Sequence, residues 1–224
     1  MASVKPPIAS SWPRAALFDF DGTLVDSFPA ITATVNHVRG LHGLPPLSLD
    51  EVKRWVGRGA AVLLARTVPA GDPSANLAAY HAHHPSVIDS GTHLMPGAAE
   101  LLHLLHDRGV SLGVCSNKAV QFTRDLVAHL ALAPFLNVVL GPEDVARPKP
   151  APDMLLEALR RLSVGATDSL YIGDMSVDVE TARGAGVPVW VVATGSETHE
   201  ALEQAKPDRL CADLRAVAAA LTSH

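Results

Sequence analysis

Short apolar runs alternate with amphipathic stretches over most of this chain. Four runs are each followed by a polar, turn-forming cluster; they are 15–20, 110–115, 170–172 and 188–192. Two weaker runs, 137–140 and 210–211, are candidates for edge strands. Apolar runs of this length, bounded by turn residues, are typical of buried β-strands.

Helix-length segments lie between these runs. Ala98–Asp107 carries four leucines at helical spacing and is followed by Gly109, a typical helix stop. Asp153–Leu162 has the same pattern after Pro152, and 177–185 repeats it. Short strands that alternate with helices predict an α/β fold, a doubly wound, Rossmann-like parallel sheet with crossover helices on both faces.

The segment 27–93 interrupts this alternation. It has helical patterning, contains no run typical of a strand, and is punctuated by glycine and proline at 40–46, 57–59 and 69–73. So long an excursion between two strands is better interpreted as an inserted domain than as a loop. We therefore predict an α/β core formed by residues 14–26 and 94–224, and a helical cap formed by residues 27–93.

Composition limits the classes of function. The chain has 224 residues, 48% of them apolar, which suffices for a core without disulfide staples. The net charge of -5 and the absence of a basic stripe argue against nucleic-acid or membrane partners. No apolar stretch approaches the roughly 18 residues that span a bilayer, and residues 1–13 do not resemble a signal peptide. We expect a soluble, cytoplasmic protein in which Cys115 and Cys211 are reduced, buried thiols, and the sequence predicts no particular oligomeric state.

Two pairs of aspartates follow predicted strands. Asp19 and Asp21 come at the end of the first run, before Gly22, which permits a sharp turn. Asp174 follows the run 170–172, and Asp178 comes four residues later, at the start of a helix. Carboxylates this close repel one another unless a cation or a shared proton intervenes, and carboxylate oxygens are ligands that suit Mg²⁺. The carboxyl edge of a parallel sheet is also where ligands bind.

Two further features suit a phosphate group. Ser116 and Asn117 follow the run 110–115, and a hydroxyl with consecutive N–H groups at a strand-to-helix turn can cradle phosphate. The same pair is also an ordinary helix start. Lys149 lies between Pro148 and Pro150, which stiffen the backbone and fix the direction of the ammonium group. Such a lysine can offset the negative charge of carboxylates and phosphate.

In their order and spacing, these four motifs resemble the haloacid dehalogenase superfamily, in particular its phosphatases, over residues 15–214. The resemblance implies that Asp19 is the nucleophile and Asp21 the general acid and base. It implies that Ser116, Asn117 and Lys149 bind the phosphoryl group. It also implies that Mg²⁺ is bound by Asp19, the Asp21 carbonyl and Asp174, with Asp178 supporting them.

Single residues separate this chain from other branches of the superfamily. Dehalogenases lack the second aspartate, which is Asp21 here, and Lys53 does not resemble the lysine of phosphonatases. The β-phosphoglucomutases typically have a histidine where this chain has Ile31, yet a phosphomutase remains an alternative. A catalytically idle binding protein is a second alternative, although Asp19, Asp21, Lys149 and Asp174 are all retained.

The chain is most similar to phosphoglycolate phosphatases, through the segments 21–27, 55–60 and 116–118. This likeness predicts hydrolysis of a small phosphorylated metabolite, with phosphoglycolate or a similar ester as the substrate. Met175 departs from these relatives, which usually have serine or threonine there. Arg58, between two glycines of the cap, is a candidate for pairing with a substrate carboxylate, although a solvated arginine is an equal interpretation. We interpret His81, His83 and His84 as a solvated helix face rather than as a metal cluster.

Overall fold

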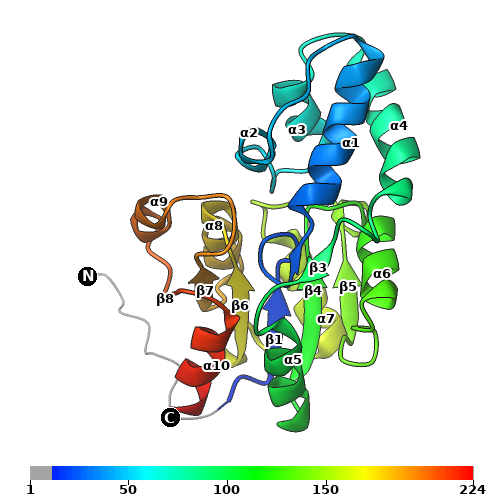
Figure 1. Ribbon diagram of the computed structural model, residues 1–224. Coiled ribbons are helices and arrows are strands. Elements are labelled where there is room, and N and C mark those ends of the chain that lie inside the picture. The colour runs from blue at the N-terminus through cyan, green and yellow to red at the C-terminus, as the bar shows by residue number, and fades with distance from the viewer. Residues whose placement is uncertain (1–11, 224) are drawn as a thin grey trace.

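The computed structural model describes residues 12–223. Residues 1–11, most of the segment that we interpreted as unlike a signal peptide, lie outside the described part, as does His224. A central sheet carries helices on both faces, and a bundle of helices lies beyond the carboxyl end of its strands (Figure 1). No helix in the described range is long and apolar enough to span a membrane.

The sheet has six strands in the order β5-β4-β1-β6-β7-β8, and every neighbouring pair is parallel. The strands are β1 (Ala15–Phe18), β4 (Ser111–Cys115), β5 (Val138–Leu140), β6 (Ser169–Gly173), β7 (Val189–Val192) and β8 (Arg209–Cys211). All six predicted runs are thus strands, and the predicted α/β fold is confirmed. The chain proceeds outward from β1 to β5 and then crosses to β6, so the strand order reverses at β1, where such sheets bind ligands.

Side chains of one strand alternate between two apolar cores. Ala16 and Phe18 belong to a core formed with α5, α6 and α10, whereas Ala15 and Leu17 belong to a core formed with α7, α8 and α9. The helices are α5 (Ala98–Asp107), α6 (Val120–His129), α7 (Asp153–Leu162), α8 (Ser176–Ala185), α9 (His199–Gln204) and α10 (Leu214–Thr222), with short 3-10 turns η2 (Pro142–Asp144) and η3 (Ala166–Asp168). Burial on both faces explains why these strands are continuous apolar runs rather than alternating ones.

The bundle beyond the sheet comprises helices from one continuous stretch of chain, and we call it the cap. Its elements are α1 (Phe28–Leu41), α2 (Leu49–Lys53), α3 (Ala60–Thr67), α4 (Pro73–His83) and the 3-10 turn η1 (His84–Ser86). It has its own apolar core, which includes Phe28, Val35 and Leu64. Local signals begin its helices: Asp72 accepts a hydrogen bond from the Ala75 N–H before α4.

A two-stranded ribbon joins the cap to the sheet. The strand β2 (Val25–Asp26) leads into the cap, β3 (His93–Leu94) leads out of it, and the two pair antiparallel. Each has two residues, so neither shows the periodicity by which a strand is recognised from sequence. The ribbon holds both crossings of the chain side by side, next to the end of β1 (Figure 1).

Candidate active site

Polar residues from three neighbouring strands meet at the carboxyl edge of the sheet. Asp19 directly follows β1, Ser116 follows β4, and Asp174 follows β6. The Asp19 N–H donates to the Ile172 carbonyl at 2.9 Å, so the sheet pairing continues to the residue that carries the carboxylate. All three side chains are buried. The predicted candidates are therefore brought together by the strand order.

A fully buried lysine lies at the centre of this group. The Nζ atom of Lys149 is 2.9 Å from Asp19 Oδ1, 2.7 Å from Asp178 Oδ1 and 3.0 Å from the Tyr171 hydroxyl. Burial alone would lower the pKa of Lys149, but the Asp178 and Asp19 carboxylates together raise it above its usual value. Lys149 is therefore a permanent positive charge beside Asp19.

Asp178 is held by the protein on both of its oxygens. Oδ2 accepts hydrogen bonds from the backbone N–H groups of Asp174 at 3.1 Å and Met175 at 3.0 Å, at the start of α8. Oδ1 contacts Lys149 and Tyr171. A carboxylate with this many partners is suited to orienting Lys149.

Three buried carboxylates lie close together, and two of them, Asp19 and Asp178, contact this ammonium group. Oxygen atoms of Asp19, Asp174 and Asp178 all lie within 4.8 Å of one another. Burial raises the pKa of Asp19 to about 6, although Lys149 opposes this, and burial together with the charge of Asp19 raises the pKa of Asp174. A divalent cation would balance the excess negative charge, and carboxylate oxygens are its natural ligands. The donor set thus fits a hard divalent metal. Asp19 and Asp174 are the better candidate ligands, because they have fewer protein partners than Asp178.

Two glycines leave the space that the Asp174 carboxylate occupies. A Cβ on Gly195 would lie 1.7 Å from Asp174 Oδ2, and one on Gly22 would lie 2.5 Å from the same atom. Gly22 also has a φ of +89°, which disfavours other residues. On the other oxygen, Thr23 donates a hydrogen bond to Asp174 Oδ1 at 2.8 Å. The turn after β1 therefore fixes Asp174 as well as Asp21.

Asp21 lies at the edge of the cluster and has a different partner. The Nζ atom of Lys118 is 3.2 Å and 3.4 Å from its two carboxylate oxygens, and Ser27 donates a further hydrogen bond to Oδ1. The Asp21 side chain is 11% exposed, more than that of Asp19. Its carboxylate faces the pocket rather than the group of three, which suits the exchange of protons with a substrate.

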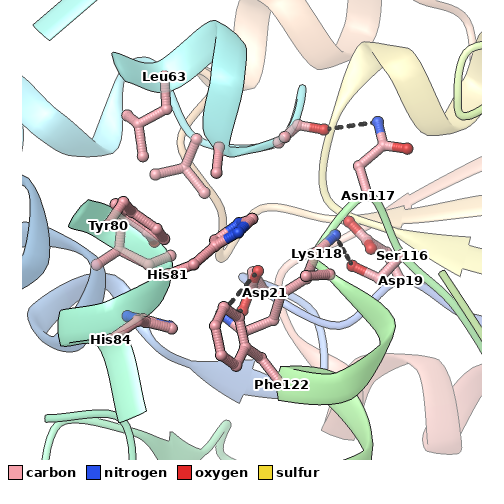
Figure 2. Close-up of a pocket in the computed structure, with 16 residues that line it drawn as sticks. Asp19, Asp21, Leu63, Tyr80, His81, His84, Ser116, Asn117, Lys118 and Phe122 are labelled. Carbon is pink, nitrogen blue, oxygen red and sulfur yellow. Dashed lines mark hydrogen bonds and ion pairs between the residues drawn. The ribbon is translucent and has the colours of Figure 1, made fainter. Parts of the chain in front are cut away.

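The side-chain amide of Asn117 joins the core to the cap. Its Nδ2 atom donates to the Gly57 carbonyl in the cap at 3.1 Å (Figure 2). The same atom donates to the Lys149 carbonyl, also at 3.1 Å. Its Oδ1 atom accepts from the Lys149 N–H at 3.0 Å. The side chain thus has a structural role, which leaves its backbone for the predicted contact with phosphate. Met175 meets the same cap loop, because a Cβ on Gly57 would lie 2.2 Å from its sulfur.

A pocket of about 510 Å³, including its open mouth, lies between the cap and the strand ends. Asp19 and Ser116 line one side, and Tyr80 and His84 line the other (Figure 2). The wall of the cap is mostly apolar; it comprises Ile31, Val56, Gly57, Gly59, Ala60, Leu63, Tyr80, His81 and His84. A substrate in this pocket would have its reacting group against the carboxylates and the remainder against the cap.

The predicted cap residues lie at different distances from the pocket. Arg58 is exposed and is not part of the pocket wall, whereas Gly57 and Gly59 on either side of it are. Its predicted pairing with a substrate carboxylate therefore stays a prediction. Lys53 lies over the Phe28 ring, 4.4 Å from its centroid, away from the site.

The interpretation of the three histidines as a solvated face is wrong for His84. Its side chain is fully buried, lies 2.8 Å from the Thr34 hydroxyl and stacks on Tyr80. Burial lowers its pKa to about 3, so the ring is neutral. The helix α4 ends against the pocket rather than in solvent, which explains the difference. His81 is exposed, and within residues 12–223 these histidines form no group of three potential metal ligands.

Sequence reasoning missed three residues of the site. Tyr171, in the buried strand β6, had the signature of an ordinary core residue, yet its hydroxyl contacts Lys149, Asp178 and the Cys115 carbonyl. Thr23 has no signal beyond its place after Gly22. Lys118 stood in the motif 116–118, and its position directly after the predicted phosphate cradle could have indicated its role.

Residues 16–192 match the family model described as haloacid dehalogenase-like hydrolase. The chain belongs to this family. The match covers both strand-end aspartate pairs and the cap, so the resemblance drawn from the motifs is confirmed. The phosphoglycolate phosphatase of Rhodospirillum rubrum is 40% identical over 194 residues, which are 82% of this chain and 80% of that protein. The phosphoglycolate phosphatase of Escherichia coli K12 is 31% identical over 219 residues, 87% of each chain.

Solved structures of this family have the same fold. One from Bacteroides fragilis, described as a haloacid dehalogenase-like hydrolase, superposes with a TM-score of 0.85 at 28% identity and covers 90% of this chain and 98% of that one. The predicted enzyme class is also confirmed: this haloacid dehalogenase-like protein is a hydrolase of the phosphatase type.

Proposed function

We propose that this phosphatase hydrolyses phosphoglycolate, or a similarly small phosphomonoester, with Mg²⁺ and through an aspartyl-phosphate on Asp19. The observation that carries the proposal is the buried Asp19 carboxylate, 2.9 Å from Lys149 and in the wall of a pocket that also contains Asp21. Similarity to phosphoglycolate phosphatases over more than four fifths of the chain supports the choice of substrate.

In the first step, an Asp19 oxygen attacks phosphorus, and the bond from phosphorus to the ester oxygen breaks. Asp21 donates its proton to that oxygen, so the alcohol leaves neutral. The charge of Lys149 stabilises the phosphoryl group during the transfer, because phosphoryl transfer depends chiefly on positioning and charge neutralisation. Ser116, buried in the pocket wall, supplies a hydroxyl for the same group.

In the second step, Asp21 is a carboxylate and removes a proton from water. The resulting hydroxide attacks phosphorus, the bond to Asp19 breaks, and phosphate leaves, which restores both aspartates. Mg²⁺ bound by Asp19, the Asp21 carbonyl and Asp174 would neutralise charge on the phosphate oxygens. The cap, held at Gly57 by Asn117, would restrict bulk water while the ester bond breaks.

The test is phosphate release from a panel of phosphorylated metabolites, with Mg²⁺ and with a chelator. We expect phosphoglycolate to have the highest kcat/KM, release to require Mg²⁺, and Asp19→Asn to abolish it. Phosphate release at the wild-type rate by Asp19→Asn would refute the mechanism. A clear preference for another ester would leave the chemistry in place and refute the substrate.

Phosphomutase activity is the alternative from the sequence. It predicts transfer of phosphate between hydroxyls of one sugar, without net release. Phosphorus NMR of a reaction with a hexose phosphate separates the two, because a new phosphate ester indicates a mutase and free phosphate indicates a hydrolase.

A further inference from the structure

Lys118 is a buried positive charge in the wall of the pocket, beside Asp21. It lies between β4 and α6, its side chain is 5% exposed, and it contacts both oxygens of Asp21. Among the described residues that line the pocket, Lys118 carries the only ammonium or guanidinium group. A lysine this buried requires an anionic partner.

Lys118 can bind a second anion without giving up this partner. An ammonium group has three N–H donors, and among the described residues only Asp21 accepts from the Lys118 ammonium group, at 3.2 Å and 3.4 Å from Nζ. Lys118 and Asp21 both line the pocket. An anionic leaving group placed beside Asp21 would therefore meet the one lysine or arginine of the described pocket wall.

From this placement we infer that Lys118 binds a carboxylate on the leaving group and thereby selects substrates with an anionic leaving group. The inference rests on the proposed function and names the residue that recognises the substrate. In phosphoglycolate one methylene separates the ester oxygen from the carboxylate. Because Asp21 must contact the ester oxygen, and Lys118 Nζ lies 3.2 Å from Asp21 Oδ1, the carboxylate falls within reach of Lys118.

This assignment replaces Arg58 as the partner of the carboxylate. Arg58 is exposed and outside the pocket wall. The other described residues of the wall include Leu63, Tyr80 and Phe122, and none of them is a lysine or an arginine. An anion paired with a buried ammonium group is also bound more selectively than one paired in solvent, because less water screens the interaction.

The test compares two esters in matched variants. The kcat/KM of phosphoglycolate is divided by that of ethyl phosphate, which has the same carbon count and no charge on the leaving group. We expect Lys118→Met to lower this ratio about 100-fold, as truncation of a buried charge partner does, largely through KM. Lys118→Arg, which keeps the charge, should retain most of the preference, and Arg58→Met should change the ratio less than about threefold.

The ratio separates recognition from damage to Asp21. If Lys118 only supported Asp21, its loss would slow the hydrolysis of both esters equally and leave the ratio unchanged. That result would overturn the inference. A fall in the ratio with Arg58→Met and none with Lys118→Met would overturn it as well. Both results leave the proposed function intact. A wild-type enzyme with no preference for phosphoglycolate over ethyl phosphate would instead refute the proposed substrate together with the inference.

Discussion

Replacement of Tyr171 by phenylalanine tests the buried charge network with the least change of shape. The substitution removes one hydroxyl and keeps the ring, which is fully buried in β6. That hydroxyl lies 3.0 Å from Lys149 Nζ, 3.0 Å from Asp178 Oδ1 and 3.1 Å from the Cys115 carbonyl. It links the ammonium group to a carboxylate and to β4, which lies on the far side of β1.

The magnitude follows from the partners that remain. Lys149 keeps its contacts with Asp19 and Asp178, so its charge stays paired. The Tyr171 hydroxyl accepts from Lys149 and donates to Asp178, and both of these hydrogen bonds are lost. Hydrogen bonds to charged groups contribute roughly 1.5–3 kcal/mol each in proteins, and part of this is recovered by relaxation. We expect the free energy of unfolding to fall by about 2 kcal/mol, and Tm by about 4–8 °C for a chain of this size.

Thermal and urea unfolding measure the stability, and phosphate release measures the effect on catalysis. Because Lys149 becomes less well oriented, we expect kcat to fall about tenfold with little change in KM. Tyr80→Phe is the matched control for stability, since Tyr80 is the other tyrosine, is also buried, and makes no described hydrogen bond through its hydroxyl. If Tyr171→Phe were as stable as Tyr80→Phe, the network would not contribute as described.

Three further predictions concern the carboxylates that we propose as metal ligands and the thiol of Cys115. Gly195→Ala should weaken Mg²⁺-dependent activity about 10–100-fold, because its Cβ would displace Asp174 Oδ2, 1.7 Å away, whereas Gly40→Ala, with nothing within 4 Å, should be neutral. In the metal-free protein, burial raises the pKa of Asp19 to about 6 from 3.8, so the stability gained from its protonation is lost as the pH rises through about 6. Mg²⁺ requires the ionised form, and its effect on Tm should therefore be larger at about pH 7.5 than at about pH 5; an effect that does not grow with pH would contradict this. Burial raises the pKa of the Cys115 thiol to about 12, so an alkylating reagent should leave it unmodified until the protein unfolds, and rapid modification of the native protein would contradict its burial.

The sheet and the position of Asp19 at a strand end could be predicted because each depends on a local pattern. The strands of the core are buried on both faces, and their apolar runs are therefore continuous and easily recognised. The polar residues that follow them, such as Asp19 and Asp174, are conspicuous for the same reason. Strand order then brings these ends together without further information from the sequence.

The residues that were missed depend on contacts between distant segments. Tyr171 is an ordinary core residue by its pattern, and only the fold shows that its hydroxyl meets Lys149. His84 ends a polar helix, and only the packing of the cap against α6 shows that it is buried. The environment of Arg58 likewise depends on the path of a cap loop. Sequence patterns describe which face of an element is buried, but not which segment covers it.

The distances along the chain that the site spans have a consequence for protein synthesis. Thr23 contacts Asp174 across 151 residues, and Thr194 contacts the Gly22 carbonyl across 172. Asp19, the proposed nucleophile, leaves the ribosome well before the segment that supplies Asp174 and Asp178. A nascent chain or an amino-terminal fragment thus carries Asp19 without Asp174 and Asp178. Hydrolytic activity reports the pairing of β6 with β1, and its recovery after dilution from denaturant measures completed folding rather than partial collapse.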